Sequence, residues 1–340
     1  LSVRKVSFQI PSMPETKGEK AQLNLVLSNA KGSQLDSITI DLRIRKPLQT
    51  HKRTFVSAVD GSVQYYAVNP ASKQSATNAL VLSLHGAGVE AIGQADAYAS
   101  KPWADIVCPT NRRPFGFDWE DWGRLDALEV LTAAGAAFPH DPQRTSLTGH
   151  SMGGHGAWHL STTFPDRFAA VGPSAGWVSF SSYAGGFTTE QPTDIEKVLM
   201  VATSPSDTLS RVRNLDAMGV YALHGDQDDN VPVTEARAMR DALQPFHRDF
   251  TLFEQPGAGH WWSASDEPGA QCVDWPKMFD LFAKRRIPAQ SEVRSFEFYT
   301  GAPNVASRCY WLAVEQQTVP FARSGVKAAV DPHLRRFTLS

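Results

Sequence analysis

The amino-acid sequence predicts an α/β fold in which a mostly parallel sheet carries helices on both faces. Between about Asn78 and Arg286, short continuous apolar runs alternate with longer amphipathic segments. Apolar runs of this kind are typical of strands buried on both faces, and the segments between them supply the covering helices. The chain is also long enough, with 340 residues of which 42% are apolar, to bury a sizeable core.

Six of the apolar runs are expected to form strands, and four of the amphipathic segments are expected to form helices. The expected strands are Leu80–Leu84, Ala104–Cys108, Thr145–Thr148, Phe168–Gly172, Gly219–Leu223 and Phe250–Phe253. The expected helices are Leu125–Ala136, Gly153–Phe164, Val233–Leu243 and Pro276–Lys284.

The two ends of the chain have a different pattern, in which apolar and polar residues alternate. This period of two indicates antiparallel strands and hairpins, and turn pairs such as Asp60-Gly61 interrupt it. We therefore divide the chain into an N-terminal β-rich segment (1–70), a central α/β domain (71–288) and a C-terminal β-rich segment (289–340). The C-terminal segment is expected to pack with the N-terminal one.

Composition excludes several classes of partner. The 33 basic and 35 acidic residues give a net charge of −2, and the longest basic run is Lys284–Arg286, so we expect no nucleic-acid partner. No apolar stretch approaches the ~18 residues of a membrane-spanning helix, so no membrane insertion is expected. The oligomeric state is not specified by the sequence.

The cysteines and the first residues leave two questions open. Cys108, Cys272 and Cys309 are widely spaced and form no C-x-x-C pair, so one disulfide with a free thiol and three buried thiols both remain open. The chain begins with Leu1 and has no signal-peptide pattern there, so the compartment is not assigned from it.

The segment Gly149-His150-Ser151-Met152-Gly153 is the most informative in the sequence. It fits the pattern G-x-S-x-G and lies between an expected strand and an expected helix, which is the context of a nucleophile elbow. Small residues on both sides let the chain turn sharply enough to lift the Ser151 hydroxyl above the sheet edge. The alternative is a glycine-rich turn that holds an incidental serine, and the strand–turn–helix context argues against it.

A second glycine-rich turn, His85-Gly86-Ala87-Gly88, follows the strand Leu80–Leu84. Ligands bind at the carboxyl ends of strands in such sheets. If the two strands are adjacent, the N–H groups of Ala87 and Met152 can form a two-donor oxyanion hole. The alternative for Ala87 is an ordinary tight turn.

A serine nucleophile requires a histidine base and an acid that orients it. The acid candidates are Asp226, Asp228 and Asp229, which follow the strand Gly219–Leu223, and we select Asp228. The other two have a ready interpretation as solvated loop or helix-capping groups, and a calcium site here lacks a full ligand pattern. The base candidate is His260, on a glycine-rich loop directly after the last strand.

Four motifs in order, His85-Gly-Ala-Gly, Gly-His-Ser151-Met-Gly-Gly, His224-Gly-x-x-Asp228-x-x-Val-Pro and Gly-Ala-Gly-His260, resemble the signatures of the α/β-hydrolase superfamily. The chain is most similar to its esterase and prolyl-oligopeptidase-like branch, where the acid stands four residues after the His of the His-Gly motif. The resemblance covers about Asn78 to Arg286. It implies an α/β-hydrolase catalytic domain with Ser151 as nucleophile, Asp228 as acid and His260 as base, and no metal or other cofactor.

The loop from Pro109 to Gly123 is dense in aromatic and charged residues and follows a strand at the same sheet edge as the elbow. The substrate contacts predicted from this loop and from the histidine loop are Arg112, Arg113, Trp119, Trp261 and Trp262. Indole faces stack on sugar rings, and an arginine binds a uronate carboxylate. The alternative is that the tryptophans pack in the core and the arginines pair with nearby carboxylates.

The stretch Trp177–Leu215 lies where a lid is inserted in this superfamily, and it is short and polar. We expect it to lack a large apolar face, which argues against a lipase. The predicted function is therefore a serine esterase that degrades polysaccharides, acting through an acyl-enzyme on an acetyl, methyl or feruloyl ester of a carbohydrate.

Two alternatives remain beside the esterase. One is a serine peptidase of the prolyl-oligopeptidase type, although neither β segment resembles the propeller that usually precedes that catalytic domain. The other is a non-catalytic binding module on a hydrolase scaffold. A polysaccharide substrate would favour a secreted or periplasmic protein.

Overall fold

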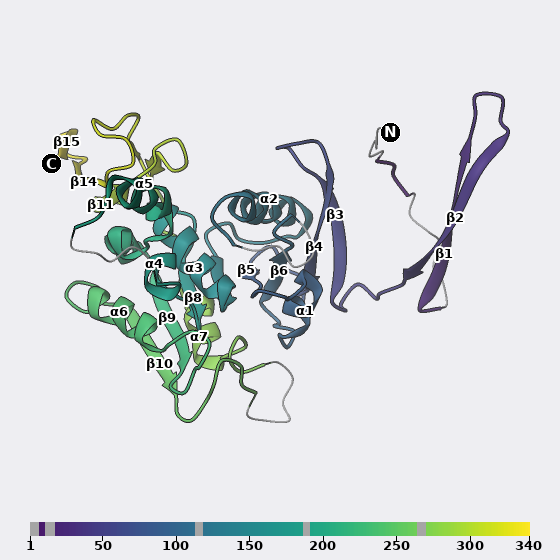
Figure 1. Ribbon diagram of the computed structural model, residues 1–340, viewed down its shortest axis with the longest axis horizontal. Helices are drawn as coiled ribbons and strands as arrows, with labels where there is room; N and C mark the ends of the chain where they lie inside the picture. The colour runs from purple at the N-terminus through teal and green to yellow at the C-terminus, as the bar shows by residue number, and fades with distance from the viewer. Residues whose placement is uncertain (1–6, 11–17, 113–117, 186–190, 264–269) are drawn as a thin grey trace.

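The computed structural model describes residues 7–10, 18–112, 118–185, 191–263 and 270–340 (Figure 1). Its centre is an eight-stranded sheet with the strand order β10-β9-β8-β7-β5-β6-β4-β3. The strands are β3 (His51–Val56), β4 (Val63–Asn69), β5 (Ala79–Leu84), β6 (Ala104–Pro109), β7 (Thr145–His150), β8 (Ala170–Ser174), β9 (Gly219–Gly225) and β10 (Phe250–Gln255). Strands β5 to β10 pair in parallel, whereas β3 and β4 are antiparallel at one edge. The prediction of an α/β-hydrolase fold, with a mostly parallel sheet, is confirmed.

Strands β3 and β4 belong to this sheet, which corrects the division of the chain at residue 70. β4 pairs with β6 from Tyr66, opposite Pro109, to Asn69, opposite Ile106. Strand β3 is largely exposed and β4 is buried only in its second half, so neither has the continuous burial of the central strands. That pattern distinguishes them from the apolar central strands, but it does not place them outside the domain.

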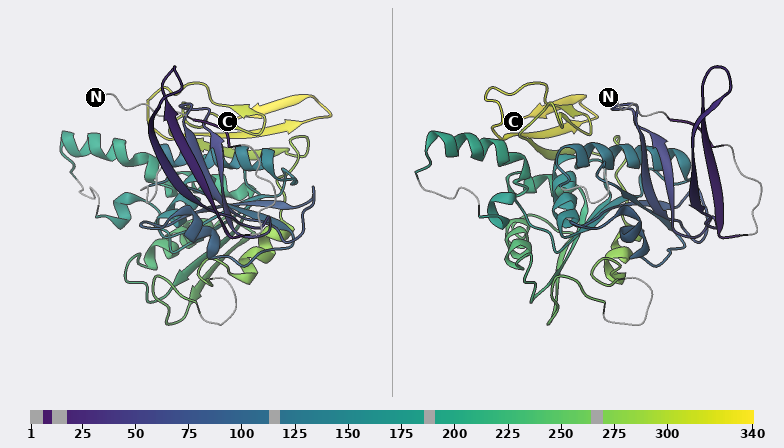
Figure 2. Two further views of the ribbon diagram at one scale, coloured as in Figure 1. Left: turned by 90° about the vertical axis from the view of Figure 1, so that its right-hand side faces the viewer. Right: turned by 45° about the vertical axis from the view of Figure 1, so that its right-hand side comes forward.

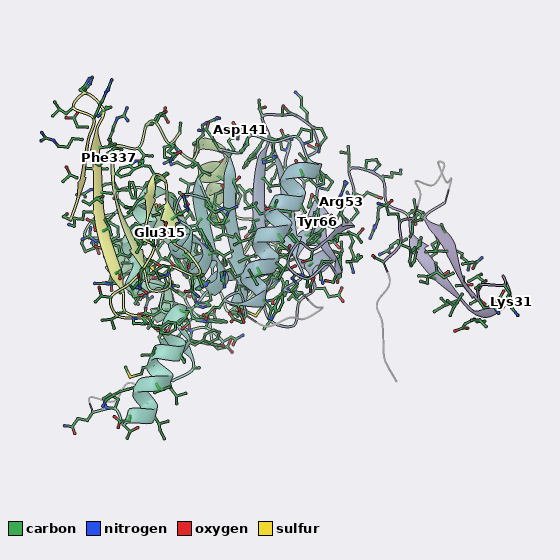
Figure 3. All side chains as sticks on the ribbon, turned by 90° about the horizontal axis from the view of Figure 1, so that it is seen from above. Lys31, Arg53, Tyr66, Asp141, Glu315 and Phe337 are labelled. Carbon is green, nitrogen blue, oxygen red and sulfur yellow. The ribbon has the colours of Figure 1, made fainter. Side chains whose placement is uncertain are left out.

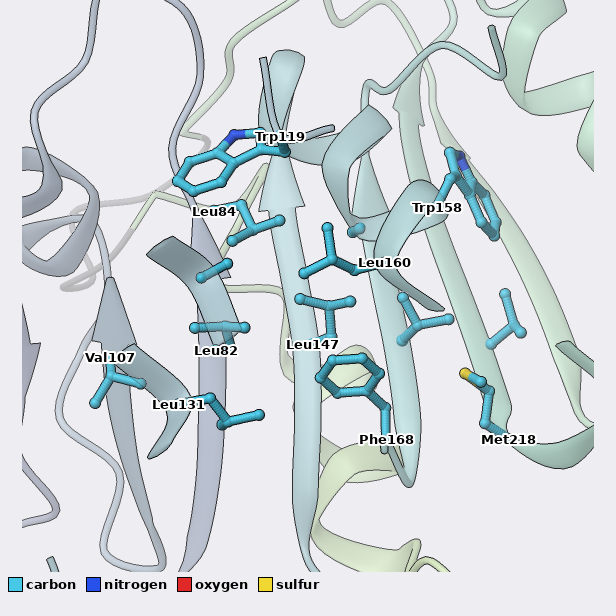
Figure 4. Close-up of a cluster of buried hydrophobic side chains, with 14 of the residues drawn as sticks. Leu82, Leu84, Val107, Trp119, Leu131, Leu147, Trp158, Leu160, Phe168 and Met218 are labelled. Carbon is cyan, nitrogen blue, oxygen red and sulfur yellow. The ribbon is translucent and has the colours of Figure 1, made fainter. Parts of the chain in front are cut away.

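Helices cover both faces of the sheet because alternate side chains of each strand point to opposite faces. One core contains Leu80, Leu82 and Leu84 with apolar residues of α2 (Trp122–Ala137), α3 (Met152–Thr163) and α6 (Thr234–Leu243), and Figure 4 shows part of it. The other contains Ala79 and Val81 with residues of α1 (Ala91–Asp96) and α7 (Pro276–Lys284). The four expected helices are confirmed, and α1, a six-residue helix, is additional.

The region between β8 and β9 is partly helical and differs from expectation. It contains α4 (Phe180–Tyr183), α5 (Asp194–Thr203) and two 3₁₀ segments, Ser204–Ser206 and Leu209–Ala217. Helix α5 projects from the domain (Figure 2), and a capping box of Thr193 and Glu196 begins it. Its exposed apolar side chains are Ile195, Val198, Leu199, Met200 and Val201. The expectation that this region lacks an apolar face is wrong, because ten of its residues form one helix whose apolar side chains have no core to enter.

The outer β strands form separate small sheets. The hairpin of β1 (Lys20–Ser28) and β2 (Gln34–Arg43) stands apart from the domain, with Lys31 at its tip (Figure 3). The C-terminal strands are β11 (Ser295–Thr300), β12 (Arg308–Cys309), β13 (Leu312–Ala313), β14 (Ser324–Asp331) and β15 (Arg336–Leu339). They lie at the opposite end of the molecule, and none of them pairs with an N-terminal strand in the described residues. The expected packing of the two ends is therefore corrected.

The structure also describes the three cysteines and the lengths of the helices. Cys108, Cys272 and Cys309 are buried free thiols, which corresponds to the second of the two open alternatives. Within the described residues, no helix combines the length and the apolar character that crossing a membrane requires.

Candidate active site

Ser151 lies at the sharp turn between β7 and α3 with φ 59° and ψ −119°. A non-glycine residue in this region of backbone space is strained by about 1–3 kcal/mol and persists only where its surroundings enforce it. In this conformation Ser151 lies at the carboxyl end of a central strand, and its side chain is partly exposed. The structure therefore gives the predicted nucleophile the backbone of an elbow.

The glycines around Ser151 are required by close approach of the backbone. A Cβ atom on Gly153 would lie under 3.0 Å from the carbonyl oxygen of Leu84, and one on Gly149 would lie under 3.0 Å from that of Gly153. The turn between β7 and α3 thus packs closely against the end of β5, where Leu84 pairs with Gly149. This contact explains why the pattern G-x-S-x-G has small residues on both sides of the serine.

Of the predicted oxyanion residues, Met152 follows Ser151 directly and Ala87 belongs to a turn that packs against Ser151. A Cβ atom on Gly86 would come within 3.4 Å of the Ser151 Cβ, so the turn that carries Ala87 packs directly against the nucleophile. Met152 is the first residue of α3, where the N–H has no partner within the helix. The indole Nε1 of Trp119 donates to the carbonyl oxygen of His85 over 3.1 Å and holds the turn in place.

Asp228 and His260 meet in a direct hydrogen bond, with 2.8 Å between Asp228 Oδ2 and His260 Nδ1. A carboxylate only accepts, so Nδ1 carries the hydrogen and the neutral imidazole has its lone pair on Nε2. The other oxygen, Oδ1, accepts the backbone N–H groups of Asn230 and Val231, both at 2.9 Å. Burial alone raises the pKa of Asp228, but hydrogen bonds from His224 and His260 outweigh it and hold the pKa well below its usual range.

The loops that carry the acid and the base are tied to one another. The N–H of Gln227 donates to the carbonyl oxygen of Ala258, and Asp226 Oδ1 accepts the N–H of Gly257 over 2.7 Å. Asp226 therefore holds the loop that carries His260 in place, whereas Asp229 is exposed. These positions agree with the choice of Asp228 as the acid that orients His260.

Two histidines that the sequence analysis did not assign support this pair. His224 Nε2 lies 2.8 Å from the carbonyl oxygen of Val231 and 3.4 Å from Asp228 Oδ2. His150 Nε2 donates to the carbonyl oxygen of His260 over 2.8 Å, and the two rings are 4.8 Å apart. Burial and the neighbouring His260 lower the pKa of His150 to about 3, so it is neutral. Both histidines belong to the motifs of the candidate triad: His150 directly precedes Ser151, and His224 stands four residues before Asp228. Their places in these motifs could have indicated a supporting role.

Most predicted substrate contacts are packed or paired. Trp119 is fully buried and Trp262 is 8% exposed. Arg112 forms an ion pair with Glu129, and its guanidinium lies 3.6 Å from Asp60 and from Asp126. Trp119 and Trp262 pack in the two cores and Arg112 pairs with carboxylates, as the alternative expected, so the prediction for these three side chains is corrected. Arg113 lies outside the described residues.

Trp261 differs from these residues because it is 52% exposed and follows His260 directly. Its ring lies 5.0 Å from that of His150 in an edge-on arrangement. Trp122, at the start of α2, is 51% exposed and lies 5.6 Å from the Arg112 guanidinium. Two indole faces therefore remain open to a ligand.

One cluster in the described residues has the composition of a metal site. Asp118, Glu120 and His155 each offer a ligand atom, and these atoms lie within 4.8 Å of one another. The cluster does not include Ser151, Asp228 or His260.

Known proteins share both the sequence pattern and the fold. The model of the prolyl oligopeptidase family, Peptidase_S9, matches residues 112–283, about half of the chain. An uncharacterized secreted protein of Arthroderma benhamiae is 27% identical over 248 residues, which cover 67% of this chain and 26% of that protein. The uncharacterized peptidase YuxL of Bacillus subtilis is 27% identical over 229 residues, which cover 61% of this chain and 34% of that protein.

The chain therefore spans between a quarter and about a third of the length of these two relatives. Among solved structures, a thermostable esterase superposes with a TM-score of 0.51 and 16% identity, covering 76% of this chain and 69% of that one. At that identity the likeness concerns the fold.

Proposed function

Because the chain belongs to the prolyl oligopeptidase family, we propose that it is a serine hydrolase that cleaves carboxylic esters through an acyl-enzyme intermediate. The observation that carries this proposal is the Asp228–His260 hydrogen bond at the sheet edge where the strained Ser151 lies. An acid, a base and a nucleophile in these positions perform acyl transfer on several unrelated folds.

Each group has a defined part in the proposed reaction. Ser151 Oγ attacks the ester carbonyl while His260 Nε2 takes its proton, and Asp228 stabilises the imidazolium that forms. The backbone N–H groups of Ala87 and Met152 bind the developing oxyanion. His260 then returns the proton to the departing alcohol. A water molecule, deprotonated by His260, hydrolyses the acyl-enzyme and restores Ser151.

A carbohydrate ester is the finer part of the proposal. It is supported by Trp261, whose exposed indole follows the proposed base and offers a flat face for a sugar ring. Trp122, the first residue of α2, offers a second exposed indole. The structure removes one argument for a uronate, since Arg112 is already paired with Glu129. Neutral acetyl, methyl and feruloyl sugar esters are therefore the preferred candidates.

A substrate panel tests the proposal. It contains acetyl, methyl and feruloyl sugar esters, a small aryl acetate, proline-containing peptides and a long-chain acyl ester, the last because α5 exposes an apolar surface. We expect turnover of the sugar esters and the aryl acetate, with much lower kcat/KM for peptides. Faster cleavage of the peptides would favour the peptidase alternative. The absence of turnover, together with no labelling of Ser151 by a fluorophosphonate, would favour the binding module.

A further inference from the structure

A cavity of about 440 Å³ separates the catalytic fold from the C-terminal segment. Its walls come from the end of the loop before α2, from the outer side of α3, from the 3₁₀ region after α5 and from residues 299–306. The charged lining groups are Asp118, Glu120, Asp121, Asp207, Arg124, Arg211 and Arg323. Ser151, Asp228 and His260 do not line this cavity, so the proposed acyl transfer leaves it without a role.

His155 and Glu120, of which Glu120 lines the cavity, meet in an arrangement that requires a proton or a metal ion between them. His155 Nδ1 lies 3.0 Å from the carbonyl oxygen of Trp177, and a carbonyl only accepts, so Nδ1 carries the hydrogen. In the neutral imidazole Nε2 then has a lone pair, and it faces Glu120 Oε1 at 3.0 Å. Two acceptors at this separation need a proton or a metal ion between them. Ligands bonded to one tetrahedral ion at about 2.0–2.2 Å are about 3.3–3.6 Å apart, so a separation of this order suits a shared ion.

Asp118 brings a second carboxylate to the same point. Its ligand oxygen lies within 4.8 Å of those of Glu120 and His155. The guanidinium of Arg124 is nearby, but its Nε donates to the backbone carbonyl of Glu120 rather than to a carboxylate of the cluster.

An independent observation comes from His159, one helical turn after His155. Its Nδ1 donates to the carbonyl oxygen of Pro205 over 3.1 Å, which leaves the lone pair on Nε2. That Nε2 is buried and has no hydrogen-bond partner among the described residues, and His159 lines the cavity beside Asp118 and Glu120. The side chain is 4% exposed, so its environment is the cavity and the protein interior rather than bulk solvent.

We propose that Asp118, Glu120 and His155 bind a divalent transition-metal ion beside the cavity that His159 lines. Imidazole and carboxylate donors suit Zn²⁺ and its neighbours. The carbonyl oxygen of Trp177 supports the site, because it fixes the tautomer of His155.

The bound ion would fasten the loop before α2 to the helix that begins beside the nucleophile. Asp118 and Glu120 belong to that loop, whereas His155 belongs to α3. The N–H of Asp118 already contacts Met152 Sδ over 3.0 Å, so the loop is close to the elbow. The expected effect of the ion is greater stability of this region, and the proposal does not depend on which ester is cleaved.

The test uses the full chain after treatment with a chelator. We expect titration calorimetry to find one Zn²⁺ ion per chain, Zn²⁺ to raise the melting temperature, and Ca²⁺ to do neither. Co²⁺ bound in place of Zn²⁺ should give visible absorption bands characteristic of nitrogen and oxygen ligands. Absence of stoichiometric Zn²⁺ binding by the chelator-treated wild type would overturn the proposal and leave His155 and Glu120 as an ion pair.

Variants locate the ion. Glu120→Gln keeps the size of a partly exposed side chain and should weaken Zn²⁺ binding at least about tenfold, and Asp118→Asn should weaken it in the same direction. Asp121→Asn is the matched control, since Asp121 is exposed on the same loop and lies outside the cluster. Wild-type affinity in both Glu120→Gln and Asp118→Asn would contradict the assignment, whatever the melting temperatures of the variants.

Discussion

His260 and Asp228 are joined by a 2.8 Å hydrogen bond, although 31 residues separate them in the sequence. Asp228 follows β9 and His260 follows β10, and these strands are neighbours in parallel register. The sheet therefore brings together two loops whose residues are distant in the chain. Contact between the loops is close, because a Cβ atom on Gly225 would lie under 3.0 Å from the carbonyl oxygens of Ala258 and Gly259.

Asp228→Asn is expected to lower kcat by about 10³- to 10⁴-fold, because an amide neither fixes the correct tautomer of His260 nor stabilises its cation. Asp229→Asn is the matched control and should remain near the wild-type rate, since Asp229 is exposed. Asp226→Asn should also lose little, because an amide oxygen can still accept the N–H of Gly257. Rate constants for the three variants decide the assignment. An inactive Asp226 or Asp229 variant beside an active Asp228 variant would contradict it.

Gly153→Ala should destabilise the fold and abolish activity, because the added Cβ would collide with the carbonyl oxygen of Leu84 in a backbone that cannot give way. Overpacking of this kind costs about 1–3 kcal/mol or more. Gly93→Ala in α1 is the matched control, because its Cβ would meet Val89 Cγ1 at an ordinary 3.6 Å. Denaturant unfolding and ester hydrolysis measure both variants. Equal free energies of unfolding for Gly153→Ala and Gly93→Ala would show that the turn at Ser151 does not pack closely against β5.

Stability should fall in acid because of His150. Its folded-state pKa of about 3 lies below the value of about 6.5 in an unfolded chain, so between these values the unfolded state binds more protons. The free energy of unfolding therefore decreases as pH falls from about 6.5 towards 3, by up to about 1.4 kcal/mol per pH unit from this group. His159 acts in the same direction.

Replacement of His150 by Gln checks whether this side chain contributes to the pH dependence of the free energy of unfolding. His150→Gln should make the slope of unfolding free energy against pH shallower between pH ~6 and ~4. His333→Gln, at an exposed position in the C-terminal segment, should leave the slope unchanged. Identical slopes for wild type and His150→Gln would show that His150 is not a buried neutral group.

Trp261→Ala should lower kcat/KM for a sugar ester about 2- to 12-fold, the range expected for loss of an aromatic contact of about 0.5–1.5 kcal/mol. A small aryl acetate uses the triad without the outer surface, so its kcat/KM should change little. Arg112→Met provides the contrast: it breaks a buried ion pair with Glu129 and should lower the melting temperature without selectivity between substrates. Equal losses on both esters in Trp261→Ala would return the substrate to an open question.

The sequence was most predictive where a motif is local. The nucleophile elbow, the His-Gly turn and the acid motif each need particular residues at fixed spacing, so their order along the chain indicated both the fold and the candidate triad. Strands β5 to β9 were found because they are buried on both faces, and continuous apolar runs are the pattern that such burial requires. Strand β10, at the edge of the sheet, is only partly buried.

The parts that were missed depend on tertiary contacts. Trp119 and Trp261 are both tryptophans in loops after strands, yet one is fully buried and the other is half exposed. Nothing in their local sequence distinguishes them, because burial is set by what the fold places above each ring. Similarly, His150 gains its positioning contact from His260, which lies on another loop. The exposed apolar side chains of α5 were overlooked because neighbouring serines and threonines masked a ten-residue helix.

The central claim is that Ser151 is the nucleophile, and the kcat of a correctly folded Ser151→Ala protein tests it most directly. The variant keeps every glycine of the elbow and removes only the hydroxyl, so circular dichroism and the melting temperature should match those of the wild type. We expect ester hydrolysis to fall by about 10⁴- to 10⁶-fold. A folded variant that retained more than about a tenth of the wild-type rate would contradict the assignment of Ser151, and with it the proposed acyl-enzyme.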